Sequence, residues 1–334
     1  MYDAPQFRGS PWHRDPRERH LRGFKCMGIF IGDDQWVAER TVERAAKRLA
    51  ALKVIVLLQD TTKITNSLQA QLLLMRHCVN AGNSYALRLT SPAALRSAVT
   101  FTHPAWHAAA ASAAPAQRMT AAAAIDAPIQ LALSHVLKFD ECSRDGQLAL
   151  RQAALPLGLG GLGLTTAADL GDASFAGSLG AAWRAMRRHV PDLRVDVEGD
   201  GAPELPSLAH LVSFLRDADA RRAELSARRD ARPPGAFRLP ALPPVPSISA
   251  LTAGPEAKAG VRLHGKLAAI VHQHNWGQLH QDLTENGIER DPARLISWSQ
   301  VGATDVHRAV PSQPQFHLES EALLFSCQRQ LGLD

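Results

Sequence analysis

The 334-residue sequence lacks long hydrophobic runs and has few aromatic residues. Its longest uninterrupted apolar stretch is about the size of residues 54–58, far below the ~20 residues that cross a bilayer as a helix. The first 25 residues are polar and arginine-rich, without the apolar segment of a secretory signal. We therefore expect no membrane insertion and no secretion, and hence an intracellular protein.

Cysteine is also scarce. The four cysteines, Cys26, Cys78, Cys142 and Cys327, lie 52, 64 and 185 residues apart along the chain. This spacing fits neither a zinc site built from paired cysteines nor a disulfide framework. We expect reduced thiols, no metal site and no cofactor.

Positive charge is in modest excess. The chain has 37 basic and 32 acidic residues, a net charge of +5, and most of the basic residues are arginine. Residues 8–25 contain six basic and two acidic residues together with two prolines, and no helical periodicity. This pattern predicts an extended, poorly ordered basic arm over residues 1–22. Such a composition permits polyanion binding without establishing it.

Helical patterns dominate the rest of the chain. After a short apolar, β-like segment at residues 26–31, a helix that Asp33 or Asp34 can cap is expected, because a carboxylate there accepts the first free backbone N–H groups. Its apolar positions recur at spacings of 4, 3, 4 and 3, and its basic residues fall on another face. The apolar positions are Ala38, Val42, Ala45, Leu49 and Leu52, and the basic ones Arg40, Arg44, Lys47 and Arg48.

Further helices are predicted along the chain, with the region after residue 190 rich in proline and glycine. The ranges are 67–79, 116–137 with an interruption near Pro128, 167–188, 208–229, 265–283 and 319–330. The fold class is therefore mainly α. The expected organisation is the arm over 1–22, a helical domain over 23–190, a Pro/Gly-rich linker with one helix over 191–260, and a small helical region over 261–334.

The tripeptide Gly32-Asp33-Asp34 matches the Gly-Asp-Asp of RNA-copying polymerases, where adjacent carboxylates on a hairpin hold two metal ions. That use requires a strand after the aspartates, yet a helix is predicted to follow at once. We interpret Asp33 and Asp34 as helix-start residues, with metal binding as the lesser alternative.

The run from Gly158 to Gly163 matches the dinucleotide-binding pattern Gly-x-Gly-x-x-Gly. The residues before it contain Pro156 and no β-branched side chain, and the residues about 20 positions later include no acid. A tight turn ahead of a helix is the better interpretation. The four histidines between 264 and 280, and the neighbours His77 and Cys78, likewise lack the spacing of a metal site or of a nucleophile with its base.

Three segments, taken in order, resemble the C-terminal part of the reverse transcriptases of non-LTR retrotransposons. Residues 23–32 (GFKCMGIFIG), with Gly28 and Gly32, resemble the family's Phe/Tyr-Leu-Gly hairpin, which grips the primer end. Residues 68–89 are similar to the thumb helix that leads to Tyr-x-Leu-Arg.

The third segment, residues 154–183, resembles the Leu-Pro-x-x-x-Gly-Gly-Leu-Gly-Leu turn and its following helix. Here the turn contains Pro156, Gly160, Gly161 and Gly163, which the resemblance makes structural residues. A weaker similarity at residues 293–333 corresponds to the region ahead of the family's Cys/His-rich tail.

The resemblance begins where the polymerase palm ends, so it implies that the catalytic aspartates would lie before Met1 and that this chain has no catalytic residues. We expect a truncated reverse transcriptase-like protein, inactive alone, that retains weak, non-specific phosphate contacts with RNA or an RNA–DNA duplex. The residues expected to bind are Arg22, Lys25, Arg40, Arg44, Lys47 and Arg48. For the basic residues of the helix, the alternative is a solvated helix face. For the protein, the alternatives are a helical protein–protein interaction module or a retroelement remnant without independent function.

Overall fold

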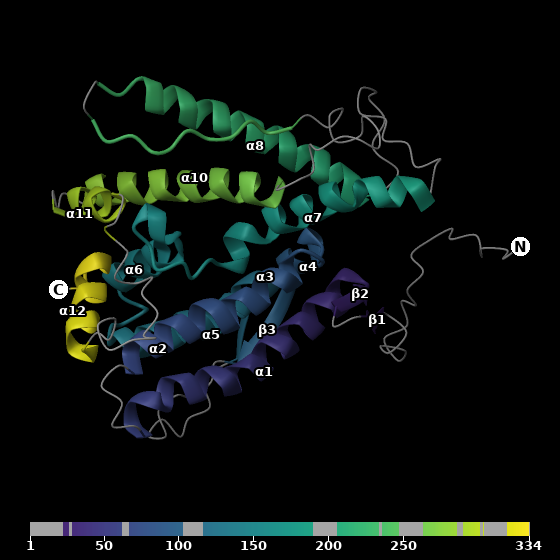
Figure 1. Cartoon of the computed structure of the whole chain (residues 1–334). Coiled ribbons are helices and arrows are strands. Elements are labelled where there is room, and N and C mark those ends of the chain that lie inside the picture. The colour runs from purple at the N-terminus through teal and green to yellow at the C-terminus, as the bar shows by residue number, and fades with distance from the viewer. Residues whose placement is uncertain are drawn as a thin grey trace, which may run out of the picture.

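The structure is a computed structural model that describes residues 23–26, 29–61, 67–102, 116–189, 206–233, 236–246, 263–285, 290–300, 303 and 319–333. It is mainly α, as predicted, with two small two-stranded sheets among the described residues. Figure 1 shows the helices stacked in layers, with α7 between the lower helices and the pair α8 and α10. None of the described helices is long and apolar enough to cross a bilayer.

The described chain begins with an antiparallel hairpin and a long helix. Strands β1 (Gly23–Cys26) and β2 (Ile29–Gly32) pair with Gly23 opposite Gly32, which confirms the β-like segment. Helix α1 (Asp34–Thr61) follows at once, and Asp33 Oδ1 accepts the backbone N–H groups of Gln35 and Trp36 at 3.1 and 3.3 Å. Asp33 therefore caps the helix, as predicted.

The second predicted helix is present but divided into three parts. It comprises α2 (Ser67–Leu74), the π-helix η2 (Met75–Asn80) and α3 (Ala81–Leu87), and α4 (Pro92–Arg96) comes next. The predicted apolar face is buried, since Leu68, Leu72, Met75 and Val79 are each at most 6% exposed. The change to π geometry was not predicted.

The helix expected over residues 116–137 begins five residues later. Residues Ala116–Thr120 form strand β4, which pairs antiparallel with β3 (Ala98–Thr102), and α5 runs over Ala121–Leu137. The prediction of a start at 116 was wrong because the partner strand lies outside the window in which helical periodicity is judged. The predicted interruption at Pro128 was also wrong. A proline removes one N–H donor from a helix. Most residues of α5 on both sides of Pro128 are buried, and the free energy of their burial offsets the lost hydrogen bond.

A glycine-rich turn connects two further helices. Helix α6 (Arg144–Ala154) leads through the 3₁₀ turn η3 (Leu157–Leu159) to α7 (Ala167–His189). The start of α7 is held by the buried carboxyl of Asp126 on α5, which accepts the N–H groups of Ala167 and Ala168 at 2.6 and 3.0 Å.

The remaining helices are α8 (Pro206–Asp230), α10 (Leu263–Glu285), α11 (Arg290–Trp298) and α12 (Ser320–Leu331). Between α8 and α10 the chain is extended over residues 236–246 and runs back beside both helices (Figure 1). Gln273 Nε2 on α10 donates to the carbonyl of Pro240 at 2.9 Å, and Leu242 and Val245 pack on the cluster that α7, α8 and α10 share.

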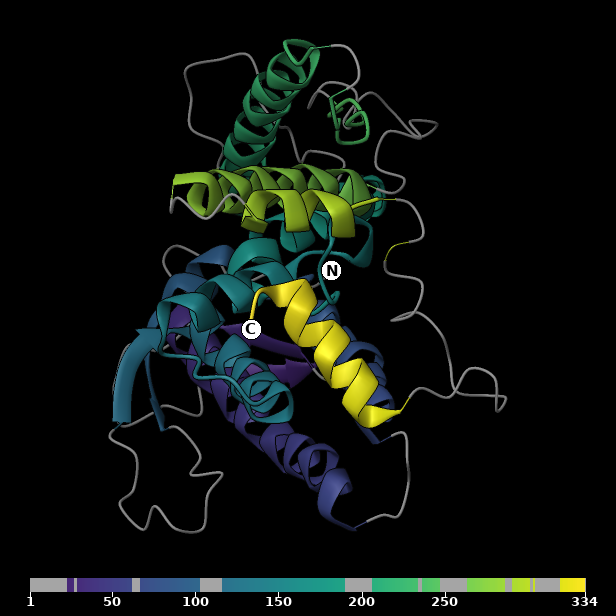
Figure 2. The same ribbon diagram turned by 90° about the vertical axis from the view of Figure 1, so that its left-hand side faces the viewer.

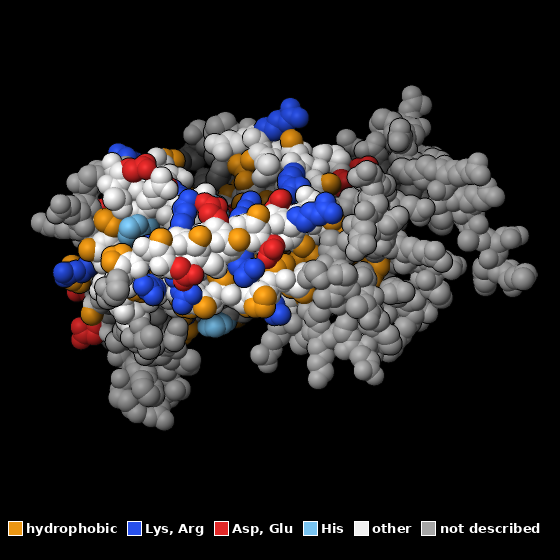
Figure 3. All heavy atoms as spheres, turned by 90° about the horizontal axis from the view of Figure 1, so that it is seen from above, with side chains coloured by type: hydrophobic (Ala, Val, Ile, Leu, Met, Phe, Trp, Pro, Cys, Tyr) orange, Lys and Arg blue, Asp and Glu red, His pale blue; other side chains and the backbone are white. Residues whose placement is uncertain are grey.

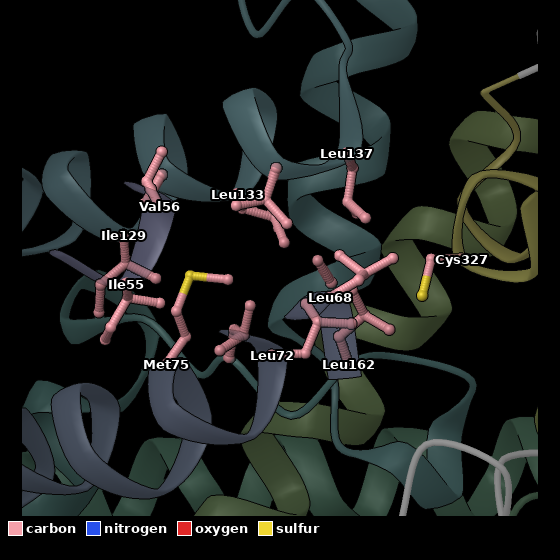
Figure 4. Packing of buried hydrophobic residues seen from close by; sticks show 14 of the residues in the cluster. Ile55, Val56, Leu68, Leu72, Met75, Ile129, Leu133, Leu137, Leu162 and Cys327 are labelled. Atoms are coloured by element: carbon pink, nitrogen blue, oxygen red, sulfur yellow. The ribbon is translucent and has the colours of Figure 1, made fainter. Parts of the chain in front are cut away.

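Two large buried clusters hold the helices together. In the first, residues of α1, α2, α5 and α6 meet Leu162 of the turn and Cys327 of α12, as Figure 4 shows around Leu72, Met75 and Leu133. Helix α12 packs on α2, α5 and α6 (Figure 2). The second cluster joins α7 to α8 and α10. Helices on both sides of residues 190 and 260 thus share buried clusters, and the domain limits expected there stay a prediction.

Candidate nucleic-acid interface

The basic residues expected to contact phosphates lie mostly on α1, at exposed or half-buried positions. Of the predicted apolar face, Ala38, Val42, Ala45 and Leu52 are buried, and the side chain of Leu49 lies outside the described residues. Lys47 is exposed, and so is Lys25 on β1. Arg22 and Gly28 lie outside the described residues.

Arg40 is partly engaged within its own helix. Its Nη1 lies 2.7 Å from a carboxylate oxygen of Glu43, and its guanidinium carbon lies 5.8 Å from the centre of the Trp36 ring. An exposed ion pair of this kind contributes about 0–1 kcal/mol, so it can be exchanged for a phosphate contact at little cost.

Arg48 is half-buried and connects α1 to α3. Its Nη2 donates to the carbonyl of Gly82 at 2.9 Å, and its Nη1 donates to Oδ1 of Asn83. Burial lowers the pKa of Arg48, and the positive charge of Arg44 lowers it further. Arg44 lies four residues before Arg48, on the same face of α1, and the acceptors that orient Arg48 are uncharged.

A groove of about 690 Å³ lies between α1 and the β3–β4 hairpin. Its charged lining residues are Glu39, Arg40, Glu43 and Arg118, so acidic and basic groups are mixed. Sequence reasoning missed this groove because the hairpin itself was not predicted. The alternation of apolar and polar residues in Ala98–Thr102, with Val99 and Phe101 buried, is the signal that could have found it.

The glycine turn is structural, as the sequence indicated. Gly160 and Gly163 adopt φ values of 76° and 72°, which L side chains rarely take. Pro156 begins the turn, and its carbonyl accepts the N–H of Gly161 at 3.1 Å. A Cβ on Gly161 would lie 2.0 Å from the carbonyl oxygen of Leu155. A helix, α6, precedes the turn where a nucleotide-binding unit has a strand, so the dinucleotide interpretation does not apply.

Buried side chains fix this turn from three other elements. Gln330 Nε2 on α12 donates to the carbonyls of Gly160 and Gly161 at 2.9 and 3.1 Å, and Gln152 Nε2 on α6 donates to Gly160 at 2.9 Å. Asn80, at the end of η2, donates to Gly163 at 3.3 Å. The amides replace the backbone partners that a turn without regular structure cannot supply.

The two aspartates of the Gly-Asp-Asp pattern have structural roles. Asp34 accepts a hydrogen bond from Ser91 Oγ at 2.5 Å, so both aspartates act at the start of α1. The part of the chain that the structure describes contains no group of three or more His, Cys, Asp or Glu side chains suited to a metal ion. On α10, burial lowers the pKa of His272 to about 4, so this side chain is neutral at physiological pH.

With the geometry of these sites established, the chain was compared with protein-family models, with curated proteins and with solved structures. Nothing matches. The reverse transcriptase resemblance therefore stays a prediction from the residues that carry it. The chemical capacity of the α1 surface comes from its side chains alone: cations placed over successive turns of a rigid helix suit the negatively charged backbone of a nucleic acid.

Proposed function

We propose that this chain is a reverse transcriptase-like protein that binds the phosphate backbone of RNA or an RNA–DNA duplex through β1 and α1. The binding surface comprises Lys25, Arg40, Arg44, Lys47 and Arg48, and Arg22 of the preceding arm is assigned to it from the sequence. The contacts are with phosphates, so the proposal includes no base-specific recognition.

The observation that carries this proposal is the state of Arg48. Its guanidinium is half-buried and is oriented by the uncharged acceptors Gly82 and Asn83. Burial lowers the pKa of Arg48, and the like charge of Arg44, one helical turn earlier, lowers it further. A phosphate oxygen beside the two guanidinium groups would relieve that repulsion. It would also find donors that are already held in place.

The test is fluorescence anisotropy of a labelled RNA–DNA hybrid titrated with the full chain at about 50, 100 and 200 mM salt. We expect the logarithm of the affinity to fall linearly with the logarithm of the salt concentration. Lys47→Gln should weaken binding and reduce the salt slope by about one, because one phosphate contact is lost.

Lys53→Gln is the matched control. Lys53 is exposed on the same helix, has the same charge and lies outside the proposed surface. Equal losses in the two variants would show that only net charge matters, which contradicts the proposed surface. Absence of binding at low salt, or binding that does not depend on salt, would refute the function itself.

A protein–protein interaction module is the second candidate, favoured by exposed apolar side chains. Val54 on α1 and Phe325 on α12 are 64% and 62% exposed. Exposed residues of this kind are docking points when they lie within an apolar patch. Sedimentation velocity over a range of concentrations tests self-association as one such interaction, and Phe325→Gln should abolish it if α12 provides the contact.

A further inference from the structure

A second surface with binding chemistry lies on the far side of α7 from α1. There a cleft of about 200 Å³ opens between α8, α10 and the extended segment 236–246. Figure 3, which looks down on α8, shows basic and acidic side chains interspersed over this helix. The cleft itself is lined by three arginines and no carboxylate, with Trp276, Gly277 and His280 on α10.

The arginines form one wall of the cleft. Arg228 Nη2 lies 2.6 Å from Glu224, and Arg229 Nη1 lies 3.6 Å from Asp230, both on the solvent side where screening is strong. Arg232 Nη1 donates to the uncharged carbonyl of Phe237 at 2.6 Å. The Nε of Arg229 is buried and has no hydrogen-bond partner in the described structure. Such a donor gains free energy from any anion that reaches it.

The floor of the cleft is apolar and rigid. The Trp276 indole N–H donates to Ser299 Oγ at 3.0 Å, which fixes the ring. His280 stacks on this ring with centroids 5.1 Å apart, and Phe237 lies 5.7 Å away. Burial and the charge of Arg232 lower the pKa of His280, so its imidazole is neutral. It forms an uncharged platform in the cleft, supported from behind by the buried Trp276 ring.

Gly277 leaves the space above this platform open. It lies in the interior of α10, where glycine is less stable than alanine by about 0.5–1 kcal/mol. A Cβ built on Gly277 would meet no atom within 4 Å. The same is true of Gly265, which is also on α10 but does not line the cleft. Residue 277 therefore controls access to the platform without being needed for packing.

We propose that this cleft binds a small aromatic phosphate of the mononucleotide class, with the phosphate on the arginine wall and the ring over the His280 imidazole. Guanidinium groups match the geometry of phosphate oxygens, and a phosphate dianion can replace the exposed carboxylates of Glu224 and Asp230 as the partner of Arg228 and Arg229. The volume is below the 300–1,000 Å³ usual for drug-sized ligands. One nucleotide, not a longer strand, is therefore the expected occupant.

The experiment is calorimetric titration of the full chain with adenosine 5′-monophosphate, with inorganic phosphate and adenosine as separate arms. We expect saturable binding of the nucleotide and binding at least about tenfold weaker for each of the two fragments, since each lacks half of the contacts. Phosphate binding as tight as nucleotide binding would overturn the aromatic half of the proposal. Absence of nucleotide binding would overturn all of it.

Two glycine variants locate the site. Gly277→Leu should weaken nucleotide binding at least about tenfold because its side chain fills the cleft, whereas Gly265→Leu should bind as the unmodified chain does. Arg228→Gln, at a largely exposed position, should also weaken binding and serves if Gly277→Leu folds poorly. Wild-type affinity in a folded Gly277→Leu variant, or in Arg228→Gln, refutes the site.

The site is independent of the proposed α1 interface, and the variants separate the two. Gly277→Leu should leave binding of the RNA–DNA hybrid unchanged, and Lys47→Gln should leave nucleotide binding unchanged. If Lys47→Gln abolishes nucleotide binding, the nucleotide is held on α1 and the cleft proposal is wrong, whatever the result with the hybrid.

Discussion

The glycines of the turn between α6 and α7 should differ sharply in their tolerance of a methyl group. In Gly161→Ala the new Cβ would lie 2.0 Å from the Leu155 carbonyl oxygen and 2.6 Å from that of Gln152. Both obstacles are backbone, so the turn must move by more than 1 Å, about the difference between 2.0 Å and an ordinary contact. Overpacking of this kind costs about 1–3 kcal/mol.

Movement of the turn also breaks hydrogen bonds that depend on its position. Gly161 N donates to Pro156, and its carbonyl accepts from Gln330, each at 3.1 Å. At about 1 kcal/mol for each bond, the total loss for Gly161→Ala is about 3–5 kcal/mol. That is a large part of the 5–15 kcal/mol typical of a folded domain.

Two neighbouring glycines provide the scale for this measurement. Gly160→Ala places an L residue at φ 76° with neighbours at 3.2 Å, among them a Ser299 side chain that can move, and should cost about 1–2 kcal/mol. Gly158→Ala meets nothing within 4 Å and should be neutral or stabilise by up to about 1 kcal/mol, because it restricts the unfolded chain.

The assay is equilibrium unfolding in urea followed by far-ultraviolet circular dichroism, with the three variants compared at a common m-value. The expected order of stability is Gly158→Ala, then Gly160→Ala, then Gly161→Ala. If Gly161→Ala unfolds within about 1 kcal/mol of Gly158→Ala, the turn is not held as the structure shows and the reasoning fails.

Three further outcomes follow from buried ionisable groups. Burial raises the pKa of Asp126 from 3.8 to about 7, so between these pH values the folded state binds a proton that the unfolded state does not. The free energy of unfolding should therefore fall as pH rises from 4 to 7, by up to about 1.4 kcal/mol per pH unit. Urea unfolding at a series of pH values measures this slope, and Asp126→Asn should remove it. His272 has the opposite effect on the pH dependence of stability, because burial lowers its pKa from 6.5 to about 4, so the free energy of unfolding should fall as pH falls through this range. Nuclear magnetic resonance should show a neutral imidazole down to about pH 4. A titration near 6.5 would contradict the burial of this side chain. Cys78 and Cys142 are exposed, whereas Cys327 is buried and burial raises its pKa to about 12. Peptide mapping after brief alkylation of the native chain should therefore find label on Cys78 and Cys142, and on Cys327 only in urea. Labelling of Cys327 at the same rate as Cys78 and Cys142 would disprove its burial.

Sequence alone was sufficient for the helices whose apolar positions repeat locally. In α1, the periodic positions Ala38, Val42, Ala45 and Leu52 are all buried, because apolar residues at helical spacing lie on one face of the helix and are removed from water together when that face packs on the core. The cap at Asp33 was also predictable, since the donors it satisfies lie within three residues. The sequence predicts a structural feature where the residues that interact in it are close together in the chain.

The features that escaped prediction depend on residues far apart in the chain. The sequence of β4 is compatible with a helix, and only its pairing with β3, which contains Val99 and Phe101, makes it a strand. Pro128 reads as a break until the burial of both its neighbours is known.

The candidate sites follow the same rule. The α1 residues were found from their spacing on one helix, although the anchoring of Arg48 by Asn83, 35 residues away, was not. The cleft between α8 and α10 was missed altogether because it joins Arg228 to Trp276 and Gly277 across a long connection. The one local hint was Gly277, a glycine inside a helical pattern with no turn to form.

The contact between α12 and α6 has a consequence for how the chain comes off the ribosome. Gln152 donates to the carbonyl of Gln330, a residue 178 positions later. At about 5–20 residues per second, translation needs roughly 10–40 s to make that stretch. Throughout this interval α12 has not been synthesised, so the cluster that contains Leu68, Leu72 and Leu162 is incomplete. A nascent chain with such exposed apolar side chains is expected to bind chaperones that prevent aggregation.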